Sequence, residues 1–130
     1  MKKRYLIFTI FGIVLLMVAT VSVNAASTTK TLNSSNPSTS PLEGGKMGER
    51  FYTSVRATSL PNGSPTIMTQ AGRKMFGIVW YDSGKGYSYP TSVGTTYTLS
   101  WDANGTWETR ATWENYTSSA PITAVFSLYD

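Results

Sequence analysis

Residues 95–113 read TTYTLSWDANGTWETRATW, and the arrangement of this stretch decides the fold. Tryptophans stand at positions 101, 107 and 113, and the dipeptide Asn104-Gly105 separates the first two. Asn-Gly is typical of a tight turn between two antiparallel strands. We therefore expect a β-hairpin here, and its register follows from the side chains.

The alternation of apolar and polar residues selects that register. With a two-residue loop, Trp101 lies opposite Glu108 and neither face of the ribbon is apolar. With a three-residue loop, Trp101 lies opposite Trp107, and one face is apolar while the other is polar. Because a shift of one residue turns every side chain to the other face, we predict the second register, with Gly105 in the left-handed conformation.

Short alternating segments recur on both sides of this stretch. Phe51, Val55 and Ala57 alternate with more polar residues, and the apolar residues at 122, 124, 126 and 128 alternate with residues that are polar except for Val125. Residues 75–81 are apolar or glycine throughout, which favours a strand covered on both faces. Turn residues cluster at 61–63, 82–86, 89–90 and 119–121. This pattern predicts an all-β domain, a small antiparallel β-sandwich or barrel of about five to seven short strands.

The first residues of the chain predict export. The basic residues 2–4 precede an uncharged, largely apolar run over 5–23, which is followed by the small residues that a signal peptidase requires. We expect a Sec signal peptide over 1–25, a helix cleaved after Ala25 or Ala26, and a secreted, extracellular protein with no stable membrane span. An uncleaved N-terminal anchor is the alternative, because the run is near the length that spans a bilayer.

The segment that follows the predicted signal has a different composition. Residues 26–46 are rich in Ser, Thr and Pro, and only Leu32 and Leu42 are large and apolar. Such a segment buries too little apolar surface to offset the entropy lost on ordering it. We expect a flexible, disordered linker over 26–46 and an antiparallel β domain over 47–130. The linker is either a functional segment, which holds the domain off a cell wall or serves as a pro-segment, or a disordered leader without a function.

The composition excludes several kinds of chemistry. The chain has no Cys and no His, which excludes a Ser-His-Asp triad, a thiol nucleophile, a zinc finger and a disulfide. Glu108 and Glu114 stand about 20 Å apart along an extended strand, too far for the carboxylate pair of a glycosidase. No spaced acidic ligands follow Asp82, as a calcium loop would require. We therefore expect no enzymatic activity, no cofactor and no metal ion.

The net charge does not favour a polyanionic partner. The formal net charge is +4, from 11 Lys and Arg against 7 Asp and Glu. Removal of the three cations in the predicted signal leaves eight against seven, so we expect no nucleic-acid partner. Freedom from Cys is more typical of a secreted protein of a Gram-positive bacterium than of a small eukaryotic extracellular domain.

Aromatic residues are the candidates for binding. The Trp101 and Trp107 pair fits either the sandwich interior, which we favour, or an outer aromatic platform for sugar rings or lipid headgroups. We expect exposed aromatic residues at the far end of the second strand and in a Gly-rich loop over 81–89. The residues predicted to bind are Tyr81, Tyr87, Tyr89, Trp113 and Tyr116, and those predicted to build the hairpin are Trp101, Trp107 and Gly105.

Two functions follow from these features. From Gly105-Thr106-Trp107 to the C-terminal strand, the chain resembles small Cys-free bacteriocins that are secreted through a signal peptide and fold as β-sandwiches, although the His residues common in such peptides are missing. The resemblance implies a secreted toxin acting on the envelope of competing bacteria. The residues by themselves predict a small secreted, non-enzymatic binding module that engages cell-wall glycan or another envelope component through exposed aromatic residues. A matrix protein that assembles through edge strands is a third possibility.

Overall fold

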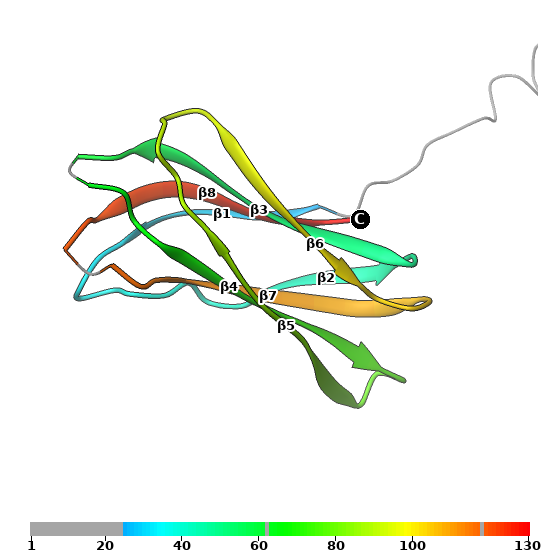
Figure 1. Ribbon diagram of the computed structural model, residues 1–130. Coiled ribbons are helices and arrows are strands. Elements are labelled where there is room, and N and C mark those ends of the chain that lie inside the picture. The colour runs from blue at the N-terminus through cyan, green and yellow to red at the C-terminus, as the bar shows by residue number, and fades with distance from the viewer. Residues whose placement is uncertain (1–24, 62, 118) are drawn as a thin grey trace, which may run out of the picture.

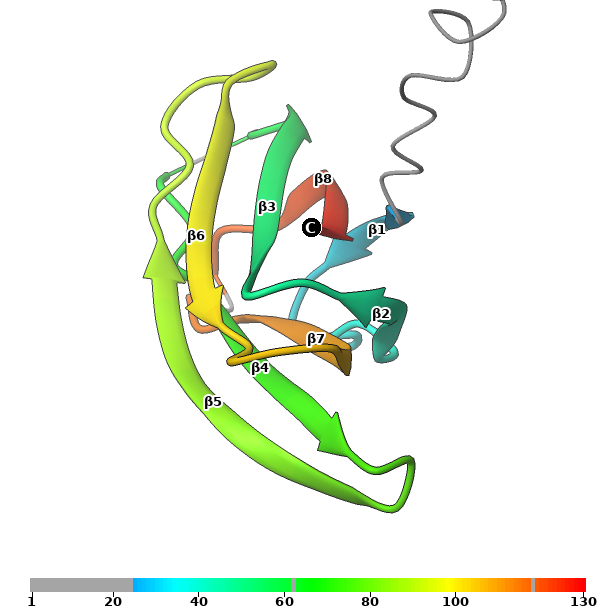
Figure 2. The same ribbon diagram turned by 90° about the vertical axis from the view of Figure 1, so that its right-hand side faces the viewer.

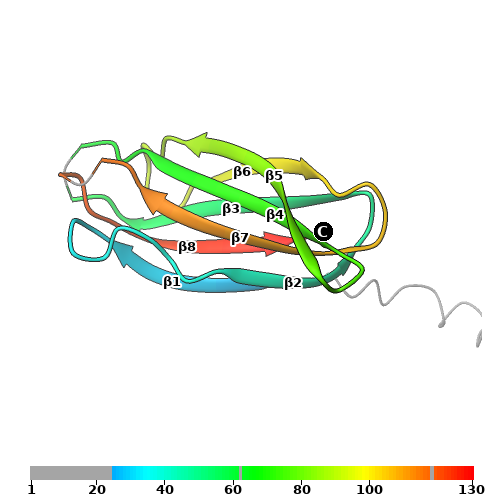
Figure 3. The same cartoon turned by 90° about the horizontal axis from the view of Figure 1, so that it is seen from below.

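The computed structural model describes residues 25–61, 63–117 and 119–130, which form eight antiparallel strands in two sheets. One sheet has the order β1-β8-β3-β6 and the other β2-β7-β4-β5. They face each other as a sandwich (Figure 1), with β1 and β2 along one edge (Figure 3). The strands are β1 (Ala26–Leu32), β2 (Leu42–Met47), β3 (Arg50–Ser59), β4 (Ile67–Met75), β5 (Val79–Ser88), β6 (Thr96–Asp102), β7 (Trp107–Asn115) and β8 (Ile122–Tyr129).

The all-β class is confirmed, with eight strands in place of five to seven. The predicted signal helix lies outside the described residues, except for Ala25. Within the described ranges, no helix is long and apolar enough to cross a bilayer. Every described strand lies between Ala26 and Asp130, and so does every buried side chain of the core, so this part of the chain contains its own core.

Alternating side chains fill the space between the two sheets. On β8 every second side chain from Ile122 to Leu128 is fully buried, as its alternation predicts. On β3, Phe51 and Val55 point into the same core. The buried Thr53 between them accepts a hydrogen bond of 2.8 Å from Nε1 of Trp101, so the indole nitrogen is satisfied inside the core.

The predicted hairpin at Asn104-Gly105 is wrong. β6 pairs with β3, whereas β7 pairs with β2 and β4, so the chain crosses from one sheet to the other between β6 and β7. Trp101 therefore lies opposite Phe51, and Trp107 lies opposite Met47. The two indoles belong to different sheets.

The crossing loop over 103–106 nevertheless keeps two predicted features. Gly105 has a positive φ of 114°, and Asn104 has one of 46°. Trp101 and Trp107 both contribute to the core between the sheets, as their alternation predicts. Two strands of one ribbon, and two strands that face each other across a sandwich, both gather their apolar side chains on one side. The pattern therefore fixes the inner face but leaves the partner strand undetermined.

The prediction of a flexible linker over 26–46 is also wrong, because this segment contains β1 and β2. β1 pairs along its whole length with β8, and β2 pairs with β7. Leu32 is fully buried, and Thr39 in the connection accepts a hydrogen bond of 3.1 Å from the backbone N–H of Trp113. Few apolar side chains suffice here, because these are edge strands that add to a core built by the rest of the chain.

The predicted loop over 81–89 is mostly strand β5. Its Gly-rich part is a β-bulge, at which Ala71 lies opposite Gly84 and Gly72 lies opposite Asp82. Gly86 makes room for the other sheet, because a Cβ at this position would lie 2.6 Å from Cδ1 of Leu99. Gly84, by contrast, has a positive φ of 115° at the bulge, which favours glycine.

The prediction that residues 75–81 form a strand covered on both faces fails as well. These residues form the end of β4, the turn between β4 and β5 and the start of β5, and Phe76, Ile78 and Val79 are exposed. The apolar run is too short to distinguish the two structures, because a run of this length occurs both in a buried strand and around an exposed turn.

The loop between β5 and β6 gives Tyr97 a lowered pKa. The Tyr97 phenol oxygen lies 3.1 Å from Thr91 Oγ1 and accepts the Thr91 backbone N–H, also at 3.1 Å. Hydrogen bonds from the Thr91 hydroxyl, the Thr91 backbone and Ser92 stabilise the phenolate, which lowers the pKa of Tyr97.

We expect this tyrosine to ionise below the ordinary value of about 10. The folded protein then loses the proton before the unfolded chain does, so Tyr97 adds stability as pH rises through its folded pKa, and that stability is absent at lower pH. An ultraviolet absorbance titration should show an early phenolate signal that Tyr97→Phe removes and Thr91→Val shifts upward. A titration left unchanged by both variants would contradict this assignment.

Candidate functional site

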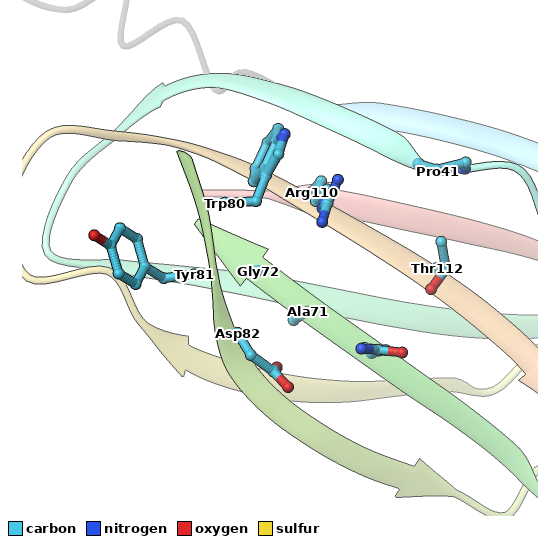
Figure 4. A pocket seen from close by; sticks show the side chains of 9 residues that line it. Pro41, Ala71, Gly72, Trp80, Tyr81, Asp82, Arg110 and Thr112 are labelled. Carbon is cyan, nitrogen blue, oxygen red and sulfur yellow. The ribbon is translucent and has the colours of Figure 1, made fainter. Parts of the chain in front are cut away.

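A groove lies on the outer face of the sheet β2-β7-β4-β5. It has a volume of about 410 Å³ and is shown in Figure 4. Strands β4, β5 and β7 and the residue before β2 supply its walls. The lining residues are Pro41, Gln70, Ala71, Gly72, Trp80, Tyr81, Asp82, Arg110 and Thr112.

The strand register explains why the sheet is hollowed at this point. Gly72 of β4 lies between Arg110 of β7 and Asp82 of β5, so a position without a side chain separates two long ones. A Cβ at Gly72 would lie 3.0 Å from the backbone carbonyl oxygen of Tyr81. Because Gly72 has no side chain, its backbone forms the floor of the groove.

Cations hold Trp80 at one end of the groove. The Arg110 guanidinium carbon lies 4.4 Å from the Trp80 ring centroid, and the Lys74 ammonium nitrogen lies 5.6 Å from it. Lys74 also forms an ion pair of 3.4 Å with Glu108. Figure 4 shows Trp80 beside Arg110, whereas Tyr81 points away from them. Cation–π contacts and the ion pair restrict the indole, so the site presents an aromatic ring in a fixed orientation.

The other side chains of the groove are polar and of mixed charge. Asp82 accepts the Gly84 backbone N–H at 2.7 Å, which fixes the carboxylate beside the bulge. Gln70 and Thr112 add an amide and a hydroxyl next to the Arg110 guanidinium. An aromatic ring with hydrogen-bonding groups of both kinds around it suits a ligand that has both an apolar face and hydroxyl groups.

The structure divides the four tyrosines that were predicted to bind into three sets. Tyr81 lines the groove. Tyr87 and Tyr116 contact each other edge to face, with ring centroids 6.3 Å apart, where β5 and β7 end. Tyr89 follows β5 and is exposed.

Trp113 corrects the prediction, because it is fully buried in the core and packs on Phe126 at a centroid distance of 5.5 Å. Trp113 shares its inward direction with Ala111, two residues earlier on β7. Exposure was expected because Trp113 stands at the far end of the second strand of the predicted hairpin, but its inward direction places it in the core.

Of the groove residues only Tyr81 was predicted to bind, and Trp80 is the most important of those that the sequence did not indicate. The uniformly apolar composition of 75–81 concealed it within an expected buried strand. A signal was present nonetheless. Trp80 and Asp82 are two apart, so on one strand they share a face, and an indole beside a carboxylate indicates an outer face.

Comparison with known proteins leaves the chain without a family. No protein-family model and no curated protein sequence matches it. Among solved structures, it is similar to the Yersinia pseudotuberculosis-derived mitogen (YPM), with a TM-score of 0.47 and 15% sequence identity, over 82% of this chain and 84% of that one.

Proposed function

We propose that this protein is a secreted, non-enzymatic binding module of the bacterial cell envelope that holds a glycan in the groove at Trp80. The observation that carries the proposal is the oriented Trp80 ring, with Gln70, Asp82, Arg110 and Thr112 within the same hollow. Sugars stack a face of C–H groups on aromatic rings while their hydroxyls take hydrogen bonds from such polar groups. The location outside the cell rests on the signal peptide predicted from the sequence.

The charge of this outer face favours a neutral or mixed ligand over a polyanion. The register places cations and anions side by side across the sheet, with Lys46 opposite Glu108 and Glu43 opposite Arg110. Four rows of outward-facing residues cross this sheet through Lys74, Gly72, Gln70 and Met68 of β4. They contain four cations and four anions, which are Lys46, Lys74, Lys85, Arg110, Glu43, Asp82, Glu108 and Glu114. A nucleic acid would instead need a predominantly basic surface.

The same face is long enough for an oligosaccharide of several units. On β7, Glu108, in the row of Trp80, and Glu114, in the row of Tyr87, are six positions apart. At the ordinary rise of a strand this is about 20 Å. Trp80 and the pair of Tyr87 and Tyr116 therefore stand at the two ends of one surface, and the groove residues lie between them.

The groove also supports the proposal of binding without catalysis. Asp82 is the only carboxylate among its nine lining residues. Hydrolysis of a glycosidic bond ordinarily uses a pair of carboxyl groups on the two sides of the bond.

We expect Trp80→Ala to weaken binding to purified Gram-positive cell wall by about tenfold or more, as for an anchoring aromatic residue in other interfaces. Gly72→Val should weaken it as well, because the new side chain fills the floor of the groove. The measurement is co-sedimentation with insoluble cell wall, together with tryptophan fluorescence on titration with soluble wall fragments.

The matched control for this test is Tyr129→Ala. Tyr129 belongs to the other sheet and stacks on Tyr52 at 5.6 Å, so its removal takes away an aromatic ring without touching the groove. Each variant should retain cooperative thermal unfolding. If the parent fails to bind cell wall, or if Trp80→Ala binds as well as Tyr129→Ala, the groove is not a glycan site.

A secreted bacteriocin-like toxin is the second candidate function. The observation in its favour is the exposed apolar turn between β4 and β5, since a toxin acting on an envelope needs a surface that engages it. A spot test of the chain 26–130 on related strains decides, because clearing of any strain supports the toxin and growth of all strains excludes it.

A further inference from the structure

The turn between β4 and β5 presents apolar side chains where water would ordinarily face polar ones. Phe76 is 82% exposed and Ile78 is 79% exposed. The Ile78 backbone N–H bonds to the Met75 carbonyl at 3.0 Å, which closes a tight turn whose two central residues are Phe76 and Gly77. Neither Phe76 nor Ile78 belongs to the buried core of the sandwich.

The backbone makes Phe76 a poor choice for the turn itself. Phe76 has a φ of 50° and Gly77 one of 70°, so both are left-handed, as in the turns that strongly prefer Asn-Gly. An aromatic residue is strained in this region, and asparagine would be better both for the backbone and for contact with water. A residue that suits neither the turn nor the solvent points to a partner outside the chain.

Aromatic and cationic groups follow the apolar tip in a fixed order. Trp107 lies just behind it, in edge contact with Phe76 at a centroid distance of 6.0 Å, and its Nε1 bonds the Asn104 carbonyl. Lys74 stands one residue before Met75, the residue that opens the turn, and Lys46 lies in the same row across Glu108. Apolar side chains, then an indole, then cations is the order of depth in a protein seated at an anionic bilayer surface.

The shape of the tip also favours a bilayer over a protein. The β4–β5 hairpin projects beyond the rest of the sandwich, with its turn at the far end (Figure 2). Two or three side chains on a convex tip fall far short of the roughly 800 Å² that each partner buries in a stable protein interface. A bilayer, by contrast, deforms around a small convex apolar group and needs no complementary cleft.

We infer that this turn is a membrane-docking tip: Phe76 and Ile78 insert into the outer leaflet of an anionic phospholipid bilayer, and Lys74 and Lys46 contact the lipid phosphates. Trp107 then sits at the level of the headgroups. Lys74 borders both this tip and the glycan groove, whereas Phe76 and Ile78 lie outside the groove lining, so variants at positions 76 and 78 test the tip alone.

The absence of Cys from the chain allows a single-site test. In the chain 26–130, Ile78→Cys carries an environment-sensitive fluorophore such as nitrobenzoxadiazole, and Val93→Cys carries it in the matched control. Val93 is 59% exposed in the β5–β6 loop, at the opposite end of the sandwich. Vesicles of equal parts phosphatidylglycerol and phosphatidylcholine should shift the emission of the label at position 78 to the blue and leave position 93 unchanged. Phosphatidylcholine vesicles, or added salt, should reduce the shift.

Unlabelled variants test the same inference by vesicle co-sedimentation. The double variant Phe76→Ser/Ile78→Ser should bind the anionic vesicles at least about tenfold more weakly, because it removes the apolar groups that insert. Val93→Ser should bind as the parent does. Lys74→Gln should weaken binding to anionic vesicles only, whereas Arg56→Gln, which removes an exposed cation from the other sheet, should not.

Several results would overturn the inference. One is an emission at position 78 that the anionic vesicles leave unshifted. Another is equal vesicle binding by the parent and the double variant, with unchanged thermal unfolding. A blue shift that appears without lipid as the protein concentration rises would assign the tip to self-association instead. Gly72→Val should bind vesicles as the parent does, and the double variant should bind cell wall as the parent does, which separates this inference from the proposed groove.

Discussion

A chain that begins at Met47 is expected not to fold. Removal of 26–46 takes away β1 and all of β2 except Met47, and with them every strand pairing on one side of β8 and all but the Met47–Trp107 pairing between β2 and β7. It also removes Leu32, which is fully buried, and the Pro37 carbonyl that accepts the Asn115 backbone N–H at 2.8 Å. The two strands left at the edge would expose unpaired N–H and C=O groups beside an open core, which favours aggregation.

Circular dichroism and thermal unfolding of the two chains, 26–130 and 47–130, provide the measurement. The longer chain should unfold cooperatively, and the shorter one should show no cooperative transition. Leu32→Ala in the longer chain gives a graded version, with an expected loss of about 2–5 kcal/mol of unfolding free energy. A cooperative transition of the 47–130 chain near that of the longer chain would restore the linker interpretation.

Trp113→Ala is expected to lower the free energy of unfolding by about 3–5 kcal/mol. Trp113 is fully buried and packs on Phe126 from the opposite sheet, so its truncation leaves a cavity between the two layers. A domain of this size has a total stability of about 5–15 kcal/mol, so this one substitution removes a large part of it. Urea denaturation followed by circular dichroism measures the change.

Tyr116→Ala is the matched control for Trp113. Tyr116 lies three residues further along and was predicted to share its exposure, yet it is 66% exposed while Trp113 is 0% exposed. We expect the Tyr116 variant to lose less than about 1 kcal/mol, since truncation leaves no cavity. Equal losses from the two variants would show that Trp113 does not occupy the core.

The sequence predicts which face of a strand is buried better than it predicts the strand with which it pairs. Ile122, Phe126 and Leu128 are buried as their alternation predicts, because period two depends only on the strand and on one core. Trp101 and Trp107 also lie on the expected inner side. Their strands join different sheets, however, and nothing in a local pattern records whether two neighbouring strands pair edge to edge or face each other across a core.

The error at 26–46 has a related cause. The composition of a segment indicates how many apolar side chains it can bury by itself. An edge strand needs few of them, because it adds to a hydrophobic core that other strands have already formed. β1 contains a single fully buried residue, Leu32, and its remaining positions are held by backbone pairing with β8. Thr and Ser tolerate extended backbone well, so a polar segment can be ordered strand when a partner is present.

Exposed aromatic residues could be predicted in part. Tyr81, Tyr87, Tyr89 and Tyr116 are exposed, as expected. The groove itself was beyond prediction, because it depends on Gly72 standing between Arg110 and Asp82, which come from three strands. The exposure of the tip could have been suspected from Phe76-Gly77, since glycine at that place allows a reversal of the chain.

The two ends of the sandwich's chain lie side by side, with Ala26 opposite Leu128 on neighbouring strands β1 and β8. A short peptide could join them, and the ring so formed could be reopened in the loop between β5 and β6, because the order of strands in each sheet does not depend on where the backbone starts. Such a circular permutant would carry its new ends at the pole opposite the apolar tip. Whatever precedes or follows the domain could then be moved from one pole to the other without altering the fold.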